Sequence, residues 1–187
     1  ALPIYAPAYA LWSDGTVKTR WIQLPAGQKI DTTDMDEWTF PVGTKIWKQF
    51  VLDGRRIETR FMWKVSAGNW AKTTYKWNDA EDAAVRLDDG FVTDGGLPGA
   101  ADGGTYEIPK VSLCDSCHNG RKDKVLGFEA INLGLPGASG LPLSKLVSDG
   151  WLTTNPPVST LTIPDDGTGK AVAALGSSLG GSGGFGG

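Results

Sequence analysis

Two cysteines and a histidine past the middle of the chain have the types and spacing most suited to chemistry. Cys114, Cys117 and His118 form the pattern C-x-x-C-H, which is typical of covalent haem attachment. Residues three positions apart share one face of a helical turn, so both thiols could reach the vinyl groups of one porphyrin. His118 would then bind the iron as its proximal ligand. The motif therefore predicts one covalently attached haem c.

Three other interpretations of the motif are weaker. A disulfide between Cys114 and Cys117 would leave His118 without a role. A zinc site usually has four protein ligands, and the chain has only two cysteines and one histidine, so zinc would need carboxylates as well. A thioredoxin-type redox motif is expected in a β-α-β context, which the sequence does not indicate. Haem attachment is the interpretation that uses all three residues.

The second axial ligand of the iron has two candidates. His118 is the only histidine, which excludes bis-histidine ligation within one chain. Methionine is the usual alternative, and the chain contains only Met35 and Met62, both before the motif. Met35 lies in a polar segment, whereas Met62 lies on an expected strand, where a methionine more often packs than ligates. We favour Met35 as the metal ligand, with Met62 or an open sixth position as alternatives.

Basic residues before the motif could pair with the propionates of a haem. The candidates are Arg20, Arg60 and Lys64. Ordinary surface salt bridges are the simpler interpretation of these three residues and are slightly favoured. A hydrolase with a Ser-His-Asp triad is excluded, because the single histidine is already assigned to the iron.

The segment before the motif is predicted to be a β-meander. Runs rich in β-branched and aromatic residues cover 17–24, 44–52, 56–65 and 70–77. Asp53-Gly54, between the second and third runs, is a strong hairpin signal. The third run alternates, with Ile57, Thr59, Phe61, Trp63 and Val65 on one face and Glu58, Arg60, Met62 and Lys64 on the other. We expect a further hairpin over 85–93 and a sandwich or small barrel overall.

A glycine- and proline-rich stretch over 94–105 divides the chain. We predict an α+β protein with the following parts: a β-rich, sandwich-like domain over 1–94, a linker over 95–105, a small and mainly helical cytochrome c-like haem domain over 106–179, and a glycine-rich tail without structure over 180–187. Helices are expected over 111–118, 141–149 and 170–179.

Composition excludes some classes of function. The formal net charge of −3 argues against nucleic-acid binding, and no apolar run approaches the roughly 20 residues that span a bilayer. The chain begins at Ala1 without a basic, apolar leader, which is expected of an exported chain after signal-peptide removal or of a trimmed one. Eight tryptophans predict a rigid aromatic core, an aromatic binding face, or both.

Several segments resemble one family of bacterial proteins. They are 9–15 (YALWSDG), 20–22 (RWI), 24–25 (LP), 33–36 (TDMD), 38–45 (WTFPVGTK), 58–60 (ETR), 108–109 (IP), the C-x-x-C-H motif and 125–131 (VLGFEAI). Together they resemble a family of exported bacterial c-type cytochrome proteins over most of residues 5–133. The resemblance implies export to the periplasm or the exterior, haem c and a redox role, without a defined substrate.

The chain departs from that family near its end. Members often carry a second C-x-x-C-H soon after an Ala-Leu-Gly such as residues 174–176, but here Ser-Ser-Leu and a glycine-rich tail follow. A second haem site is therefore lost or cut off. We expect a mono-haem electron carrier that meets redox partner proteins. The alternatives are a peroxidase-like haem oxidoreductase with an open sixth position and a structural subunit of a larger redox complex.

Overall fold

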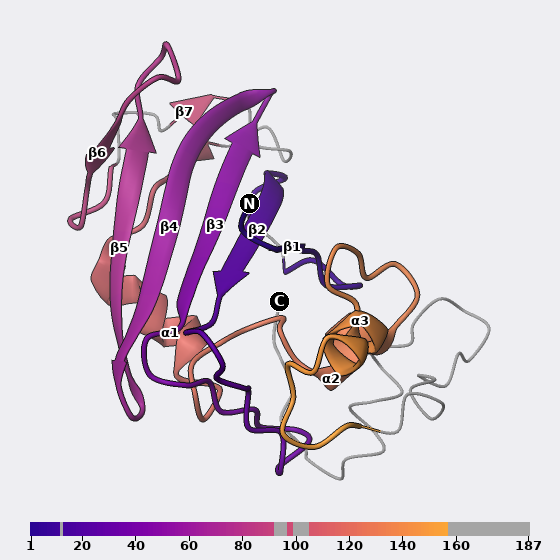
Figure 1. The fold of residues 1–187 in the computed structure, drawn as a ribbon. Helices are drawn as coiled ribbons and strands as arrows, with labels where there is room; N and C mark the ends of the chain where they lie inside the picture. The colour runs from indigo at the N-terminus through magenta and orange to yellow at the C-terminus, as the bar shows by residue number, and fades with distance from the viewer. Residues whose placement is uncertain (12, 92–96, 99–104, 157–187) are drawn as a thin grey trace, which may run out of the picture.

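The computed structural model describes residues 1–11, 13–91, 97–98 and 105–156. The N-terminal half is a six-stranded antiparallel sheet whose strands lie side by side in chain order (Figure 1). Its strands are β1 (Ile4–Tyr5), β2 (Val17–Gln23), β3 (Lys45–Leu52), β4 (Arg55–Ser66), β5 (Asn69–Trp77) and β6 (Ala84–Arg86). The predicted meander is confirmed, and Asp53-Gly54 forms the β3–β4 turn with positive φ at both residues.

Two details of the β prediction are wrong for the described residues. The expected hairpin over 85–93 does not form there, because β6 pairs with β5 and Phe91 pairs with Ile108. A second large sheet, as a sandwich needs, is also not found within the described ranges. The other sheet there pairs only β7 (Leu97–Pro98) with β8 (Thr105–Tyr106). Loops and short helices cover one face of the meander instead.

The second half contains short helices. The 3-10 turn η1 (Val111–Leu113) leads directly into α1 (Cys114–His118), which confirms the helix expected over 111–118. The helix expected over 141–149 is α3 (Leu143–Ser148), and Gly150 follows its end with a φ of 70°. The helix α2 (Ala130–Gly134) has only five residues, too few to show a periodic pattern. The helix expected over 170–179 and the tail lie outside the described residues.

Both halves contribute to one hydrophobic cluster. Ile22 and Ile46 of the sheet pack in it with Phe128 and Leu133 of the second half. The rings of Tyr5 and Phe128 meet edge to face, with centroids 4.7 Å apart. This shared cluster holds the loop after α1, and the helices α2 and α3, against the sheet. The predicted domain boundaries are not tested by this packing and stay a prediction.

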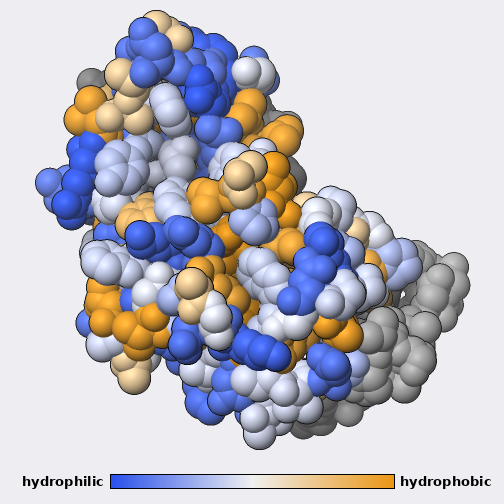
Figure 2. All heavy atoms as spheres, in the orientation of Figure 1, coloured by the Kyte–Doolittle hydropathy of each residue, from blue (hydrophilic) through white to orange (hydrophobic). Residues whose placement is uncertain are grey.

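The covered face of β4 is its charged face. Glu58, Met62 and Lys64 are buried beneath the second half of the chain, whereas Trp63 on the opposite face is 43% exposed. On the side of the molecule seen in Figure 2, patches of hydrophobic and hydrophilic residues lie next to one another. An amphipathic strand usually buries its apolar face. The reversal means that several charges of the sheet need partners from the second half.

Candidate haem-attachment site

The two cysteines lie on the single short helix α1 as free thiols. Cys114 is half-buried and Cys117 is exposed. Their separation of three residues brings both sulfurs to one side of the turn. Burial raises the pKa of the Cys114 thiol, so this group is protonated at neutral pH. The two thiols are not joined in a disulfide in this structure.

The ring of His118 is oriented by the main chain. Its Nδ1 lies 2.5 Å from the carbonyl oxygen of Lys124. Because a carbonyl can only accept a hydrogen bond, Nδ1 donates and Nε2 is left with a lone pair. Burial also lowers the pKa of His118, which favours the neutral ring. A neutral imidazole with a fixed Nδ1–H is the form that binds a metal.

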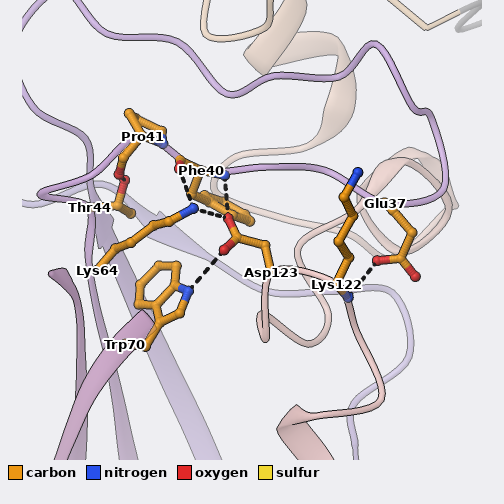
Figure 3. A network of polar contacts seen from close by, with 8 residues as sticks. All are labelled: Glu37, Phe40, Pro41, Thr44, Lys64, Trp70, Lys122 and Asp123. Carbon is orange, nitrogen blue, oxygen red and sulfur yellow. Dashed lines mark hydrogen bonds and ion pairs between the residues drawn. The ribbon is translucent and has the colours of Figure 1, made fainter. Parts of the chain in front are cut away.

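The Lys124 carbonyl belongs to a loop that is anchored on the sheet. Lys124 itself has a φ of 60°, which is uncommon for a residue other than glycine. Next to it, the buried carboxylate of Asp123 accepts three hydrogen bonds (Figure 3). They come from Lys64 Nζ at 2.6 Å, the main-chain N–H of Phe40 at 2.6 Å and Trp70 Nε1 at 3.2 Å. The acceptor of His118 is thus held by the β half.

Two further contacts join the helix and its loop to the first half. Lys72 of β5 forms an ion pair with Asp115 of α1, and this hydrogen bond lowers the pKa of Asp115. The main-chain N–H of Lys122 donates to Glu37 Oε2 at 3.0 Å, as Figure 3 also shows. These contacts fix both ends of the segment that carries the motif.

A cavity lies beside His118, between α1 and the covered face of the sheet. Its lining includes His118, Met62 and the basic residues Arg20, Lys48 and Arg60. Its volume is about 60 Å³, below the roughly 300 Å³ of the smallest common ligand sites. A larger cavity of about 680 Å³ also contacts Arg60 and reaches the residue before Cys114.

The donor set fits a haem. The structure brings together Cys114, Cys117 and His118 on α1, and Met62 lines the cavity that His118 lines. Met35 is partly buried and packs against the main hydrophobic cluster, and it is not among the residues that line this cavity. The choice of Met35 as a metal ligand is not tested directly and stays a prediction.

The three basic residues considered for propionates divide into two groups. Arg20 and Arg60 line the cavity beside His118, whereas Lys64 is buried elsewhere in its ion pair with Asp123. Sequence reasoning missed Lys48, which lines the same cavity, and Asp123. Strand register could have found Lys48, because it lies directly opposite Arg20 in the β2–β3 pair. No pattern in the neighbouring sequence identifies Asp123 as a residue of the site.

Other findings bear on the alternatives. Within the described ranges, no group of three or more histidine, cysteine, aspartate or glutamate side chains is arranged to hold a metal ion, so a zinc site would need further ligands. No described helix combines the length and apolar character needed to cross a membrane. Comparisons with protein-family models, curated proteins and solved structures found no match.

Proposed function

We propose that this chain is a mono-haem c-type cytochrome that transfers electrons outside the cytoplasm. The observation that carries the proposal is the hydrogen bond from His118 Nδ1 to the Lys124 carbonyl, which leaves Nε2 free beside two thiols on the same helix. A disulfide or a thioredoxin-type motif would not need an oriented imidazole. The haem would supply one-electron chemistry through its iron, and the protein supplies attachment, orientation and a dry surrounding.

Each residue of the motif has a separate role in this proposal. The thiols of Cys114 and Cys117 would each add across one vinyl group, with the sulfur and the hydrogen both retained in the product. His118 would hold the iron. As the second residue to hold it we propose Met62 rather than Met35, since Met62 lines the cavity beside His118. A thioether ligand raises the reduction potential, as suits an electron carrier.

Expression of the chain with an export signal in a bacterium that can mature c-type cytochromes tests the proposal. We expect coloured protein whose intact mass exceeds that of the polypeptide by one haem, and a pyridine haemochrome spectrum typical of two thioethers. The double variant Cys114→Ala, Cys117→Ala is the matched control and should lose covalent haem. Colourless wild-type protein with the mass of the bare polypeptide would contradict the proposal.

A second candidate function is a docking subunit of a multi-protein redox complex. It is favoured by the outer face of the sheet, where Trp63 is 43%, Val65 39% and Val17 68% exposed. On this face the rings of Trp47 and Phe61 also pack together, with centroids 5.3 Å apart. Such a surface suits protein partners. Concentration-dependent association in analytical ultracentrifugation that is weakened by Trp63→Ser would support this candidate, and a monomer at all concentrations would count against self-association.

A further inference from the structure

Three basic residues form a row across the covered face of the sheet. Arg20 on β2 lies directly opposite Lys48 on β3, and Lys48 lies directly opposite Arg60 on β4. All three line the cavity that also contains His118 and Met62. Like charges directly opposite one another destabilise a sheet. A row of this kind is therefore expected to serve an anionic ligand rather than the stability of the sheet.

Within the described part of the chain, these three basic residues are paired with too few carboxylates. Glu58 is buried, and its Oε1 lies 2.6 Å from Arg60 Nη2. The hydroxyl of Tyr106 donates a hydrogen bond to the same Glu58 oxygen. No described carboxylate lies within ion-pair distance of Arg20 or Lys48. Arg20 and Lys48, beside the cavity, are thus left without an anionic partner from these residues.

Because Arg20 is buried and Lys48 is half-buried, the lack of an anionic partner lowers the stability of the fold. The side chain of Arg20 is nearly inaccessible, with 5% of the residue exposed. Burial lowers the pKa of Lys48 to about 7, and the nearby positive charges of Arg20, Arg60 and Lys18 act in the same direction. The carboxylate of Glu58 offsets only part of this shift. An unpaired buried charge is strongly unfavourable. A ligand with two negative charges would remove this cost.

We propose that Arg20 and Lys48 bind the two carboxylates of the porphyrin, while Glu58 holds Arg60 beside them. The inference rests on the proposed function, because the neighbouring C-x-x-C-H motif is what points to a porphyrin. Two carboxylates on flexible arms match two separate cations, and the planar guanidinium of Arg20 can bind one of them with two hydrogen bonds. A doubly charged inorganic anion such as phosphate has related chemistry and is separated from a porphyrin in the test.

The test uses the full chain made without haem, so that attachment and iron ligation do not contribute. Metal-free protoporphyrin and its dimethyl ester are each titrated into the protein, and binding is measured from the quenching of tryptophan fluorescence. We expect wild-type protein to bind the diacid at least about tenfold more tightly than the ester, as charge-assisted hydrogen bonds imply. Arg20→Gln and Lys48→Met should each reduce this preference severalfold or more.

Two control variants make the result specific. Lys48→Arg keeps the charge and should keep the preference. Lys45→Met removes a charge from the same strand on the other face, where Lys45 lies 5.7 Å from the centroid of Trp63, and should also keep it. Circular dichroism tests whether each variant is folded. If either Arg20→Gln or Lys48→Met is not folded, the other of these two variants is used for the comparison.

The outcomes separate this inference from the proposed function. Equal binding of diacid and ester by the wild type, or an unchanged preference in folded Lys48→Met, would overturn the inference even if haem is attached covalently in the maturing host. Displacement of the diacid by equimolar inorganic phosphate would also overturn it in favour of a phosphate site. A clear diacid preference without covalent haem in that host would support the carboxylate site and reject the cytochrome.

Discussion

Lys64 and Asp123 form a buried ion pair that joins β4 to the loop after α1. Their Nζ and Oδ2 atoms are 2.6 Å apart, and the two side chains are 2% and 4% exposed. Lys64 Nζ also donates to the carbonyl of Phe40 at 2.7 Å. Because Asp123 precedes the residue whose carbonyl orients His118, this pair connects the stability of the fold to the geometry of the site.

Breaking this pair should destabilise the protein strongly. Asp123→Asn keeps hydrogen-bond capacity but leaves Lys64 charged and buried without a counter-charge. We expect the free energy of unfolding, measured by urea titration, to fall by about 3–5 kcal/mol. Arg55→Ala breaks the exposed pair with Asp79 and should cost at most about 1 kcal/mol. Similar losses of unfolding free energy in the two variants would show that the buried pair stabilises the fold no more than the exposed pair does.

The two methionines should behave differently in the haem-loaded protein. Met62→Ala should abolish the weak far-red absorption band of the oxidised form that marks a bond from methionine sulfur to iron. It should also lower the reduction potential, because a thioether ligand raises it. Met35→Ala should leave both unchanged. The reverse pattern would restore Met35 as the ligand, and rapid carbon monoxide binding by the reduced wild type would indicate an open sixth position.

The pKa of Lys48 predicts how stability depends on pH in the haem-free chain. The folded value of about 7 lies below the ordinary 10.5, so between these two values the unfolded chain binds more protons than the folded one. Stability should therefore rise with pH through this window, by up to about 1.4 kcal/mol per pH unit. Below about pH 7 lysine is protonated in both states and adds no slope.

Urea unfolding at about pH 7 and 8.5 measures this slope. Burial raises the pKa of the Cys114 thiol in the folded chain, so this thiol loses its proton first in the unfolded chain and adds a slope of opposite sign, which Lys48→Met leaves in place. Lys48→Met should remove most of the rise, and Lys45→Met should leave it in place. A slope that is unchanged in Lys48→Met would contradict the assignment of this proton to Lys48.

Gly140 should not tolerate a side chain. Its φ is 74°, and an added Cβ would lie 2.1 Å from the main-chain oxygen of Ile4 in β1. Gly54 in the β3–β4 turn has a similar φ of 79° but open space around it, so Gly54→Ala measures backbone strain alone. We expect Gly140→Ala to lower the melting temperature clearly more than Gly54→Ala does, because it also separates β1 from the second half. Equal shifts would mean that the clash is relieved by a small movement.

Local patterns in the sequence were enough for several elements. The strands β2 to β5 were predicted within about two residues, because β-branched and aromatic runs separated by turn residues carry their own signal. The turn at Asp53-Gly54 follows from its residue types between two strands, and the helix at the motif follows from the spacing of its cysteines. The chemistry of the site was also local, since both thiols and the imidazole lie within five consecutive residues.

The tertiary structure decided which face of the sheet is covered and which distant groups meet. Alternation in β4 separates two faces but cannot say which one packs against the second half, and here it is the face with Lys64 and Met62. The pairing of Phe91 with Ile108, and of Asp123 with Lys64, likewise joins residues far apart in the chain. Spacing within a segment records only local geometry, whereas burial and charge pairing arise when separate segments pack, so the surroundings of the motif could be learned only from the fold.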